Sequence, residues 1–346
     1  MKPIRVIQWT TGKVGRHSLR AILEDPRLEL VGLFAHSPEK TGQDAGELIG
    51  LPPCGVRASN DVDSLLSLNA DAVVYTPFEA NLAHAVSLLE AGVNIISTNL
   101  FANVGGMQEP QTRAQIERAC KIGNSSLLIT GVNPGWVNSV AVLTTAVCRR
   151  VEQITINESA DCSGYQSPET WIGNGMSLPQ GDENTFENTK RSLLPFKDTI
   201  YRMAEALSIS LDSVDFYAEH AVTSETVDLG WFRMEQGTIG ALRAGWNGVS
   251  QGKVVLRTRV AWYLTRKLDC DWVFDDDHYH IVVEGDPGVD TRIRFSAPDY
   301  WQQAGWGILT GLPAVSNIPN VVAAAPGILS LRDSSLPDVP MGLWAH

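Results

Sequence analysis

The chain has 346 residues, of which 44% are hydrophobic and 19% charged, and its formal net charge is −12 at pH 7. This length favours two domains, because single hydrophobic cores stop growing beyond roughly 250–300 residues. The acidic balance and the lack of Lys/Arg runs argue against a nucleic-acid partner. No segment has the roughly 18 consecutive apolar residues of a membrane span, and the N-terminus lacks a signal-peptide pattern. A cytoplasmic protein without nucleic-acid or membrane partners is therefore expected.

Cysteine and histidine spacing gives little sign of a metal. The five cysteines are scattered and form no CxxC pair, which predicts free thiols and no structural zinc. His278 and His280 stand beside the acidic run 275–277 and could be interpreted as a metal site. A polar strand end is the commoner meaning of such a pair, so no metal is predicted.

Strands and helices alternate in the N-terminal part. Residues 4–9 (IRVIQW) predict a buried strand, which a turn and a helix connect to a second strand at 28–35 (LELVGLFA). This alternation with short apolar strands is typical of a parallel, doubly wound sheet covered on both faces. The further elements expected are strands at 71–77, 93–98 and 126–130 and helices at 79–91 and 109–123.

The pattern changes after GVNPG (131–135). Long alternating strands dominate from 214 to 295 and indicate a mixed, largely antiparallel sheet. We expect a Rossmann domain at 1–135 and an α+β domain for substrate binding and dimerisation at 136–346. The C-terminal tail is expected to pack back on the Rossmann domain, because so apolar a segment would not stay soluble if exposed. The elements expected before residue 214 are a helix at 137–149, a strand at 151–162, a polar loop at 163–182 and one long helix at 184–208.

The turn TTGKVG occupies the place of a GxGxxG dinucleotide fingerprint, with Thr10 where the first glycine normally stands. Gly12 would let the backbone approach a pyrophosphate, and Gly15 would let the helix pack closely on the strand. The helix N-terminus would offer N–H groups and partial positive charge to the phosphates. A plain tight turn in a non-binding domain is the alternative. The turn residues expected to bind a cofactor are Thr10, Thr11, Gly12, Lys13, Val14 and Gly15.

The end of the second strand, FAHSPEK, bears on the choice of cofactor. Folds that prefer NAD usually carry an Asp or Glu there for the ribose hydroxyls. Here His36, Ser37 and Lys40 can donate to a 2′-phosphate, and Glu39 is the only acid nearby. We therefore expect NADP as the cofactor, with NAD as the alternative. Alternatively, Lys40 is only a surface residue of a solvated loop and does not favour NADP over NAD.

The segments WTTGKVGRHSLRAI, HSPEKTGQDAGEL, DAVVYTP, NIISTN and GVNPGW together resemble the dihydrodipicolinate-reductase-like NAD(P)-dependent oxidoreductases. Within that group the chain resembles 2,4-diaminopentanoate dehydrogenases and native amine dehydrogenases. The resemblance extends to ESADCSGYQSPETW, VVEGDP and PAVSNIPNVVAAAPGI in the second half. It implies that Thr76, Pro77 and Asn99 line the cofactor and that Asn133 lies beside the nicotinamide.

One departure from the family pattern affects the expected reaction. Family amine dehydrogenases carry a Glu shortly after the strand equivalent to NIIST, whereas residues 99–103 read NLFAN and no acid follows before Glu109. Activation of ammonia needs a general base within hydrogen-bond reach. We therefore expect hydride transfer to a C=O or preformed C=N group, or the reverse oxidation of an alcohol or amine. Ammonia-dependent reductive amination is the alternative, and a non-catalytic NAD(P)H-binding sensor is a second one.

Catalytic candidates gather where the first strand of the second half ends. Period-2 alternation puts Glu158 and Asp161 on opposite faces, so both carboxylates cannot serve one site. We expect Tyr165 to be the proton donor with Asp161 as its electrostatic partner, and Glu158 is a further candidate. Alternatively, Asp161 and Ser163 simply begin the polar loop.

The second half also bears on the substrate and on assembly. Most of the ten tryptophans lie there, and pockets lined by aromatic rings suit a small hydrophobic ketone, imine or amine. Long strands such as KVVLRTRVAWYL often pair across a two-fold axis, so a homodimer is expected.

Overall fold

The computed structural model describes residues 2–275, 278–296 and 307–333. Two compact units make up the chain: the first runs to Ser139 and includes the C-terminal segment 307–333, and the second is Val140–Ser296. The helix α5 (Val137–Thr144) begins in one unit and ends in the other. Within the described ranges, no helix is long and apolar enough to cross a membrane.

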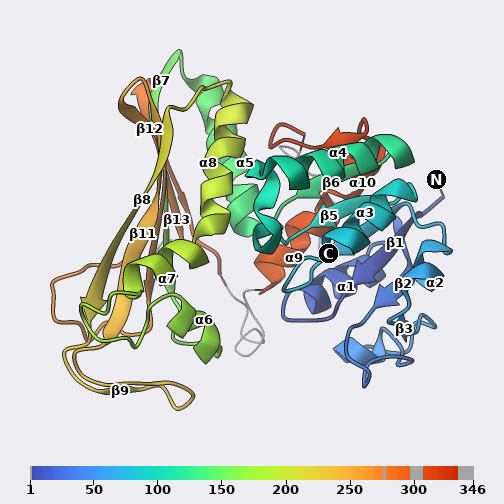
Figure 1. Cartoon of the computed structure of the whole chain (residues 1–346), viewed down its shortest axis with the longest axis horizontal. Helices are drawn as coiled ribbons and strands as arrows, with labels where there is room; N and C mark the ends of the chain where they lie inside the picture. Colours follow the sequence, from blue (N-terminus) through green and yellow to red (C-terminus); the bar gives the residue numbers. More distant parts are fainter. Residues whose placement is uncertain (1, 276–277, 297–306, 334–346) are drawn as a thin grey trace. The chain divides into compact units, whose positions relative to one another are not determined.

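The first unit is built on a seven-stranded sheet in which every pairing is parallel, in the order β15-β6-β5-β4-β1-β2-β3 (Figure 1). The predicted parallel, doubly wound sheet is confirmed. The sequence order reverses between β1 and β4, and ligands of such folds bind outside the carboxyl ends of the strands at this point. The strands are β1 (Ile4–Trp9), β2 (Leu28–Phe34), β3 (Ala58–Ser59), β4 (Ala72–Tyr75), β5 (Asn94–Ser97), β6 (Ser126–Ile129) and β15 (Gly327–Ile328).

Helices cover both faces of this sheet. On one face, a hydrophobic cluster joins buried side chains of α3 and α4, such as Leu88 and Ile116, to the strands. On the other face, a second cluster joins Leu19 of α1 to Val315 and Ile318 of the C-terminal helices. The helices are α1 (Gly15–Glu24), α2 (Val62–Leu66), α3 (Leu82–Glu90), α4 (Pro110–Gly123), α9 (Gly307–Ser316) and α10 (Ile318–Ala323).

The second unit is built on a six-stranded sheet in the order β14-β13-β7-β12-β11-β8. Only β7 and β12 pair in parallel and the other four pairings are antiparallel, which confirms the predicted mixed, largely antiparallel sheet. The strands are β7 (Arg150–Asp161), β8 (Ser213–Val222), β11 (Ile239–Ser250), β12 (Lys253–Tyr263), β13 (Tyr279–Asp286) and β14 (Val289–Ile293).

Three helices lie on one face of this second sheet, which we call its inner face: α6 (Pro168–Gly173), α7 (Thr185–Ser192) and α8 (Leu194–Leu207) (Figure 1). The single long helix expected at 184–208 is wrong. The chain breaks at Leu193 because Pro195 has no N–H, and its ring would clash with the carbonyl of Arg191 in a continuous helix. The loop expected at 163–182 contains α6, whose first residue is Pro168, a residue suited to the first helical turn.

Candidate functional site

The turn after β1 holds Thr10 in the left-handed region, at φ 72°. A β-branched residue is strained there. Hydrogen bonds hold it: its hydroxyl donates to the carbonyl of Thr76 (3.0 Å), and the buried Gln8 amide donates to the carbonyl of Thr10 (3.0 Å) and to the Thr76 hydroxyl (3.0 Å). The Thr76 hydroxyl in turn donates to the carbonyl of Trp9 (2.7 Å). This network lets a threonine occupy the position where a dinucleotide fingerprint usually has glycine.

The two glycines of the turn serve different purposes. A Cβ on Gly15 would lie 2.3 Å from the carbonyl oxygen of Thr10 and 2.6 Å from the hydroxyl oxygen of Thr76, so the packing of α1 requires glycine. A Cβ on Gly12 would meet nothing within 4 Å. No neighbour among the described residues therefore requires a glycine at position 12, and the open space fits a cradle for a bound group. In the described part of the chain no side chain caps the N-terminus of α1 at Val14, so a phosphate could accept hydrogen bonds from its N–H groups.

The residues after β2 approach this turn. The ammonium of Lys40 donates to the hydroxyl of Thr11 (3.2 Å), which connects the loop after β2 to the phosphate turn. Ser37 is engaged with Glu39: hydrogen bonds from the backbone N–H of Glu39 and then from the Ser37 hydroxyl lower the pKa of the Glu39 carboxyl. The His36 ring is exposed and stands edge-on to Phe34, with ring centroids 4.8 Å apart.

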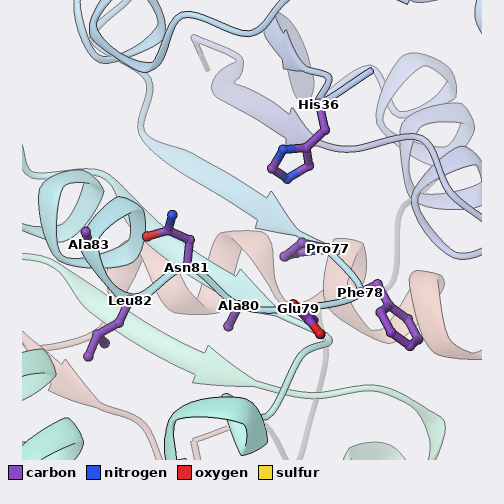
Figure 2. A pocket seen from close by; sticks show the side chains of 8 residues that line it. All are labelled: His36, Pro77, Phe78, Glu79, Ala80, Asn81, Leu82 and Ala83. Carbon is purple, nitrogen blue, oxygen red and sulfur yellow. The ribbon is translucent and has the colours of Figure 1, made fainter. Parts of the chain in front are cut away.

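A cavity of about 670 Å³ opens between His36 and the segment 77–83, which follows β4 (Figure 2). Pro77 lines it, and the ring of Phe78 is 94% exposed beside it. The side chain of Asn99 hydrogen-bonds to the backbone of this loop. Its amide donates to the carbonyls of Pro77 (3.2 Å) and Phe78 (2.9 Å), and its oxygen accepts from the N–H of Phe101 (2.6 Å). Asn99 therefore fixes the loop that lines the cavity.

The expected cofactor residues of the first unit lie at one edge of its sheet. Thr10, Thr76, Asn99 and Asn133 follow β1, β4, β5 and β6, and the carboxyl ends of parallel strands meet at the same edge. Asn133 lies in an irregular segment, Val132–Trp136, and its peptide bond to Pro134 is cis.

In the second unit, Glu158 lies on the inner face of the sheet, where it pairs in register with Tyr279 on β13 and Val260 on β12. The indole N–H of Trp262 donates to its carboxylate (2.9 Å). Burial and then the charge of Glu158 raise the pKa of the Tyr279 hydroxyl well above 10.0. Burial, followed by the same charge, raises the pKa of the Cys162 thiol well above 9.0.

The other two expected catalytic residues, Asp161 and Tyr165, have different surroundings. Asp161 is exposed at the end of β7, and its carboxylate accepts the backbone N–H of Ser163 (2.9 Å), as expected of a residue that begins a loop. The ring of Tyr165 stands edge-on to Trp171 (5.7 Å between centroids), and Trp171 stands edge-on to Trp262 (6.2 Å). Tyr165 thus belongs to the aromatic cluster that holds Glu158. Burial, followed by the charge of Cys162, raises the pKa of the Tyr165 hydroxyl above 10.0.

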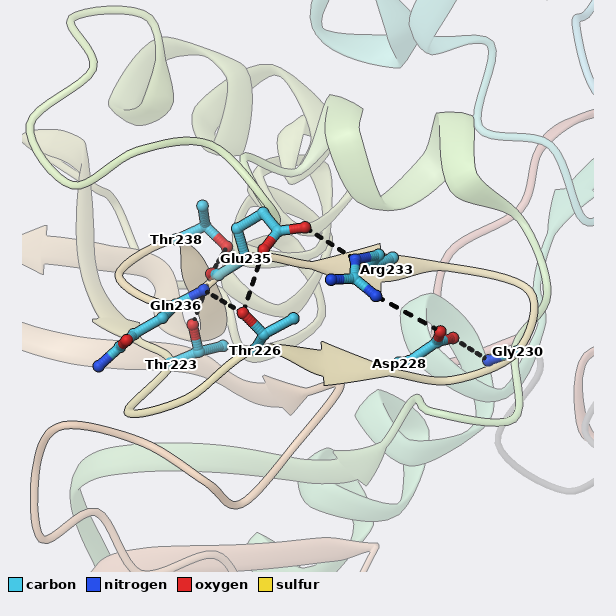
Figure 3. A network of polar contacts seen from close by, with 8 residues as sticks. All are labelled: Thr223, Thr226, Asp228, Gly230, Arg233, Glu235, Gln236 and Thr238. Atoms are coloured by element: carbon cyan, nitrogen blue, oxygen red, sulfur yellow. Dashed lines mark hydrogen bonds and ion pairs between the residues drawn. The ribbon is translucent and has the colours of Figure 1, made fainter.

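Sequence reasoning missed a hairpin arm, residues 223–238, formed by β9 (Val227–Asp228) and β10 (Arg233–Met234). The carboxylate of Glu235 accepts from the Arg233 guanidinium (2.8 Å) and from the Thr226 hydroxyl (3.0 Å), which stiffens the arm (Figure 3). At the tip, the indole N–H of Trp231 donates to the carbonyl of Ser163 (2.9 Å). The arm therefore supports the loop that carries Tyr165.

The histidines read as a possible metal site have other partners. Nε2 of His280 lies 2.8 Å from the Asp290 carboxylate, and Nδ1 of His278 accepts the N–H of Phe295 (3.1 Å). Residues 276–277 of the acidic run lie outside the described residues.

Comparison with known proteins identifies both halves of the chain. Residues 6–121 match the N-terminus of dihydrodipicolinate reductase. Residues 137–345, more than half of the chain, match the C-terminal domain of 2,4-diaminopentanoate dehydrogenase. The chain belongs to the 2,4-diaminopentanoate dehydrogenase C-terminal domain family. The resemblance expected from the sequence is confirmed.

Two relatives of this family member align over nearly its whole length. An amine dehydrogenase from Streptomyces virginiae is 28% identical over 96% of both chains. A 2,4-diaminopentanoate dehydrogenase from Acetoanaerobium sticklandii is 21% identical over 99% of this chain and 96% of its own. The solved structure of an amine dehydrogenase from Mycobacterium smegmatis shares the fold, with a TM-score of 0.74 and 19% identity over 96% of this chain and 95% of that one. The protein is thus an NAD(P)-dependent oxidoreductase that transfers a hydride to or from a C=O or C=N group.

Proposed function

We propose that the protein is an amine dehydrogenase, which converts a small hydrophobic ketone and ammonia reversibly into a primary amine. The observation that carries the proposal is the alignment of an amine dehydrogenase and a 2,4-diaminopentanoate dehydrogenase with both units of the chain. The aromatic residues around Glu158 support a hydrophobic substrate, because apolar walls with few polar groups select such molecules. In this proposal the first unit binds the cofactor and the second binds the substrate.

The proposed cofactor is NADP, held at the carboxyl edge of the parallel sheet. The open space at Gly12 and the uncapped N-terminus of α1 suit the pyrophosphate. Lys40 and His36 suit a 2′-phosphate, and the cavity beside His36 and Pro77 suits the adenosine half. Asn133 would lie near the nicotinamide, which supplies or accepts the hydride when the cofactor is bound. NAD remains the alternative cofactor.

A second candidate function is reduction of a ketone or preformed imine without ammonia. The residues after β5 favour it, because Asn99 and Asn103 hold loop carbonyls there and offer no base. The next acid, Glu109, caps the N-terminus of α4. With no base at that position, activation of ammonia needs an acid from elsewhere.

Cofactor oxidation with a series of hydrophobic ketones, with and without ammonium chloride, tests the proposal. We expect NADPH oxidation that depends on ammonia, with the primary amine identified by mass spectrometry. Oxidation at the same rate without ammonia would replace the proposal by the second candidate. Absence of turnover with every ketone, together with NADPH binding, would support the sensor function instead.

We also propose that the protein is a homodimer formed through the outer face of the six-stranded sheet, opposite to α6, α7 and α8. A hollow of about 310 Å³ on this face is lined by Tyr217, Glu219, Arg243 and Arg259, among others. The face carries both signs of charge in neighbouring strands. A two-fold axis would therefore set arginines of one copy against carboxylates of the other.

A further inference from the structure

The ring of Phe78 lies almost fully in solvent beside the proposed cofactor site. Its side chain is 94% exposed, the highest value of any large hydrophobic side chain in the described residues. Phe78 follows β4 closely and lines the same cavity as His36 (Figure 2). Single exposed apolar side chains are common on protein surfaces, so the exposure alone indicates no function. The loop that carries the ring gives the second observation.

Two asparagines from the segment after β5 hold this loop. Asn99 donates to the carbonyls of Pro77 (3.2 Å) and Phe78 (2.9 Å). Asn103 contacts the backbone of Ala80 as a neighbouring strand would: its oxygen accepts the N–H (3.2 Å), and its amide donates to the carbonyl (2.8 Å). The backbone on both sides of the ring is therefore hydrogen-bonded, which fixes the loop while the ring of Phe78 stays exposed.

The cavity beside Phe78 suits an uncharged planar base better than a phosphate. Apolar side chains such as Pro77 and Leu82 line it, and Glu79, the only carboxylate among its lining residues, would repel a phosphate. A base can stack on an aromatic side chain whatever its hydrogen-bonding pattern, because every base has a π face. A ring that is fixed before binding loses little further conformational freedom when a ligand covers it.

We propose that Phe78 is the platform on which the adenine ring of the cofactor stacks, and that Asn103 is a positioning residue that holds its loop. This inference rests on the cofactor site proposed above. It is independent of the choice between NADP and NAD, because both carry adenine, and of the reaction that the hydride serves. It gives the segment NLFAN (99–103) a task in cofactor binding.

Calorimetric titration of the full chain with NADPH and with adenosine 2′,5′-bisphosphate, the adenine half of NADP, tests the stacking. Phe78→Ala should weaken both ligands by the same factor, about 5- to 150-fold, as expected for the loss of stacking on one base. Its melting temperature should stay unchanged, because the ring is exposed. Phe78→Tyr keeps an aromatic ring and should bind like the parent. Ile122→Ala, which shortens an exposed apolar side chain of α4, should also bind like the parent.

The outcomes separate this inference from the proposed preference for NADP. Equal affinity of Phe78→Ala and the parent would overturn the stacking, and weaker binding of NADPH alone would overturn its assignment to adenine. If the parent binds NADH in place of NADPH, the preference for NADP fails, and the same comparison with NADH and adenosine 5′-monophosphate decides the role of Phe78. A parent that binds neither cofactor would overturn both.

A double-mutant cycle with NADPH tests the positioning role. Asn103→Ala should weaken binding about two- to tenfold, the range for one net hydrogen bond. In the Phe78→Ala background the same substitution should have almost no effect, because the loop then carries no ring to position. Equal losses in both backgrounds would show that Asn103 acts independently of Phe78 and would refute the role. Asn103→Asp, which keeps the acceptor and removes the donor, replaces the alanine variant if that one fails to fold.

Discussion

At the scale of single residues, Thr10 illustrates how a local network can replace a glycine. Its left-handed backbone, at φ 72°, would cost free energy in isolation, of order 1–3 kcal/mol for such strain. Gln8 and Thr76 surround it with hydrogen bonds of 3.0 Å, and both side chains are buried. The fingerprint pattern predicts the turn, but it does not reveal these partners, because Thr76 is 66 residues away in the chain.

The two glycines of the turn allow a matched pair of substitutions. Gly12→Val should abolish NADPH binding and leave the melting temperature close to that of the parent, because a Cβ there meets no atom of the described residues within 4 Å. Gly15→Ala should instead lower the melting temperature, since overpacking typically costs about 1–3 kcal/mol. Fluorescence titration with NADPH and thermal denaturation measure both effects. Unchanged NADPH affinity in Gly12→Val would contradict the phosphate cradle.

Lys40 should set the preference for NADPH over NADH. A charge-assisted hydrogen bond to the 2′-phosphate is worth about 1.5–3 kcal/mol, so Lys40→Ala should reduce the ratio of the two affinities by more than about tenfold. Arg20→Ala, which removes an exposed cation paired with Glu24 on α1, should leave the ratio unchanged. The measurement is the Kd of each cofactor for the three proteins. Equal affinities of the parent for both cofactors would refute the preference.

At the scale of elements, hydrophobic periodicity predicts the strands and the parallel sheet well, because short apolar runs between helices leave few alternative topologies. It fails where one residue decides a boundary, as Pro195 does between α7 and α8. Periodicity also does not predict the surroundings of Glu158. Alternation puts Glu158 and Asp161 on opposite faces of the strand, but Trp262, which donates to the Glu158 carboxylate, is 104 residues away in the chain. That contact depends on the register of β7 against β12, which no local pattern specifies.

The hairpin arm should influence substrate binding through its tip. Trp231→Phe keeps a ring that can stack on Phe232 and removes the N–H that donates to Ser163. Loss of one hydrogen bond, worth about 0.5–1.5 kcal/mol, should loosen the Tyr165 loop and raise KM for the ketone severalfold, with the Kd for NADPH unchanged. Trp272→Phe removes an indole N–H in the same way at a ring that the Arg243 guanidinium covers, 4.4 Å from its centroid, and should leave KM unaltered. An unchanged KM in Trp231→Phe would show that the arm has no part in the substrate site.

At the scale of the whole molecule, each unit has its own sheet and its own helices, and the two sheets differ in exposure. Helices cover both faces of the parallel sheet, whereas α6, α7 and α8 lie on the inner face of the mixed sheet. The outer face presents Arg257 and Arg259 on β12 and Asp215 and Glu219 on β8. Because the same face carries both charges, a second copy turned by a two-fold axis would be complementary to it.

Light scattering of the parent at micromolar concentration should therefore give a mass twice that of one chain. Arg259→Glu should shift the equilibrium strongly toward the monomer, because an isologous interface repeats the substitution on both sides and like charges placed together cost several kcal/mol. Arg113→Glu reverses the charge of a residue that pairs with Glu117 on α4, in the first unit, and should remain dimeric. The dimer should also weaken in high salt, since partly exposed charge pairs are screened. A parent protein that is monomeric at this concentration would rule out the outer face as a stable interface, and a dimer that Arg259→Glu leaves intact would place the interface elsewhere on the chain.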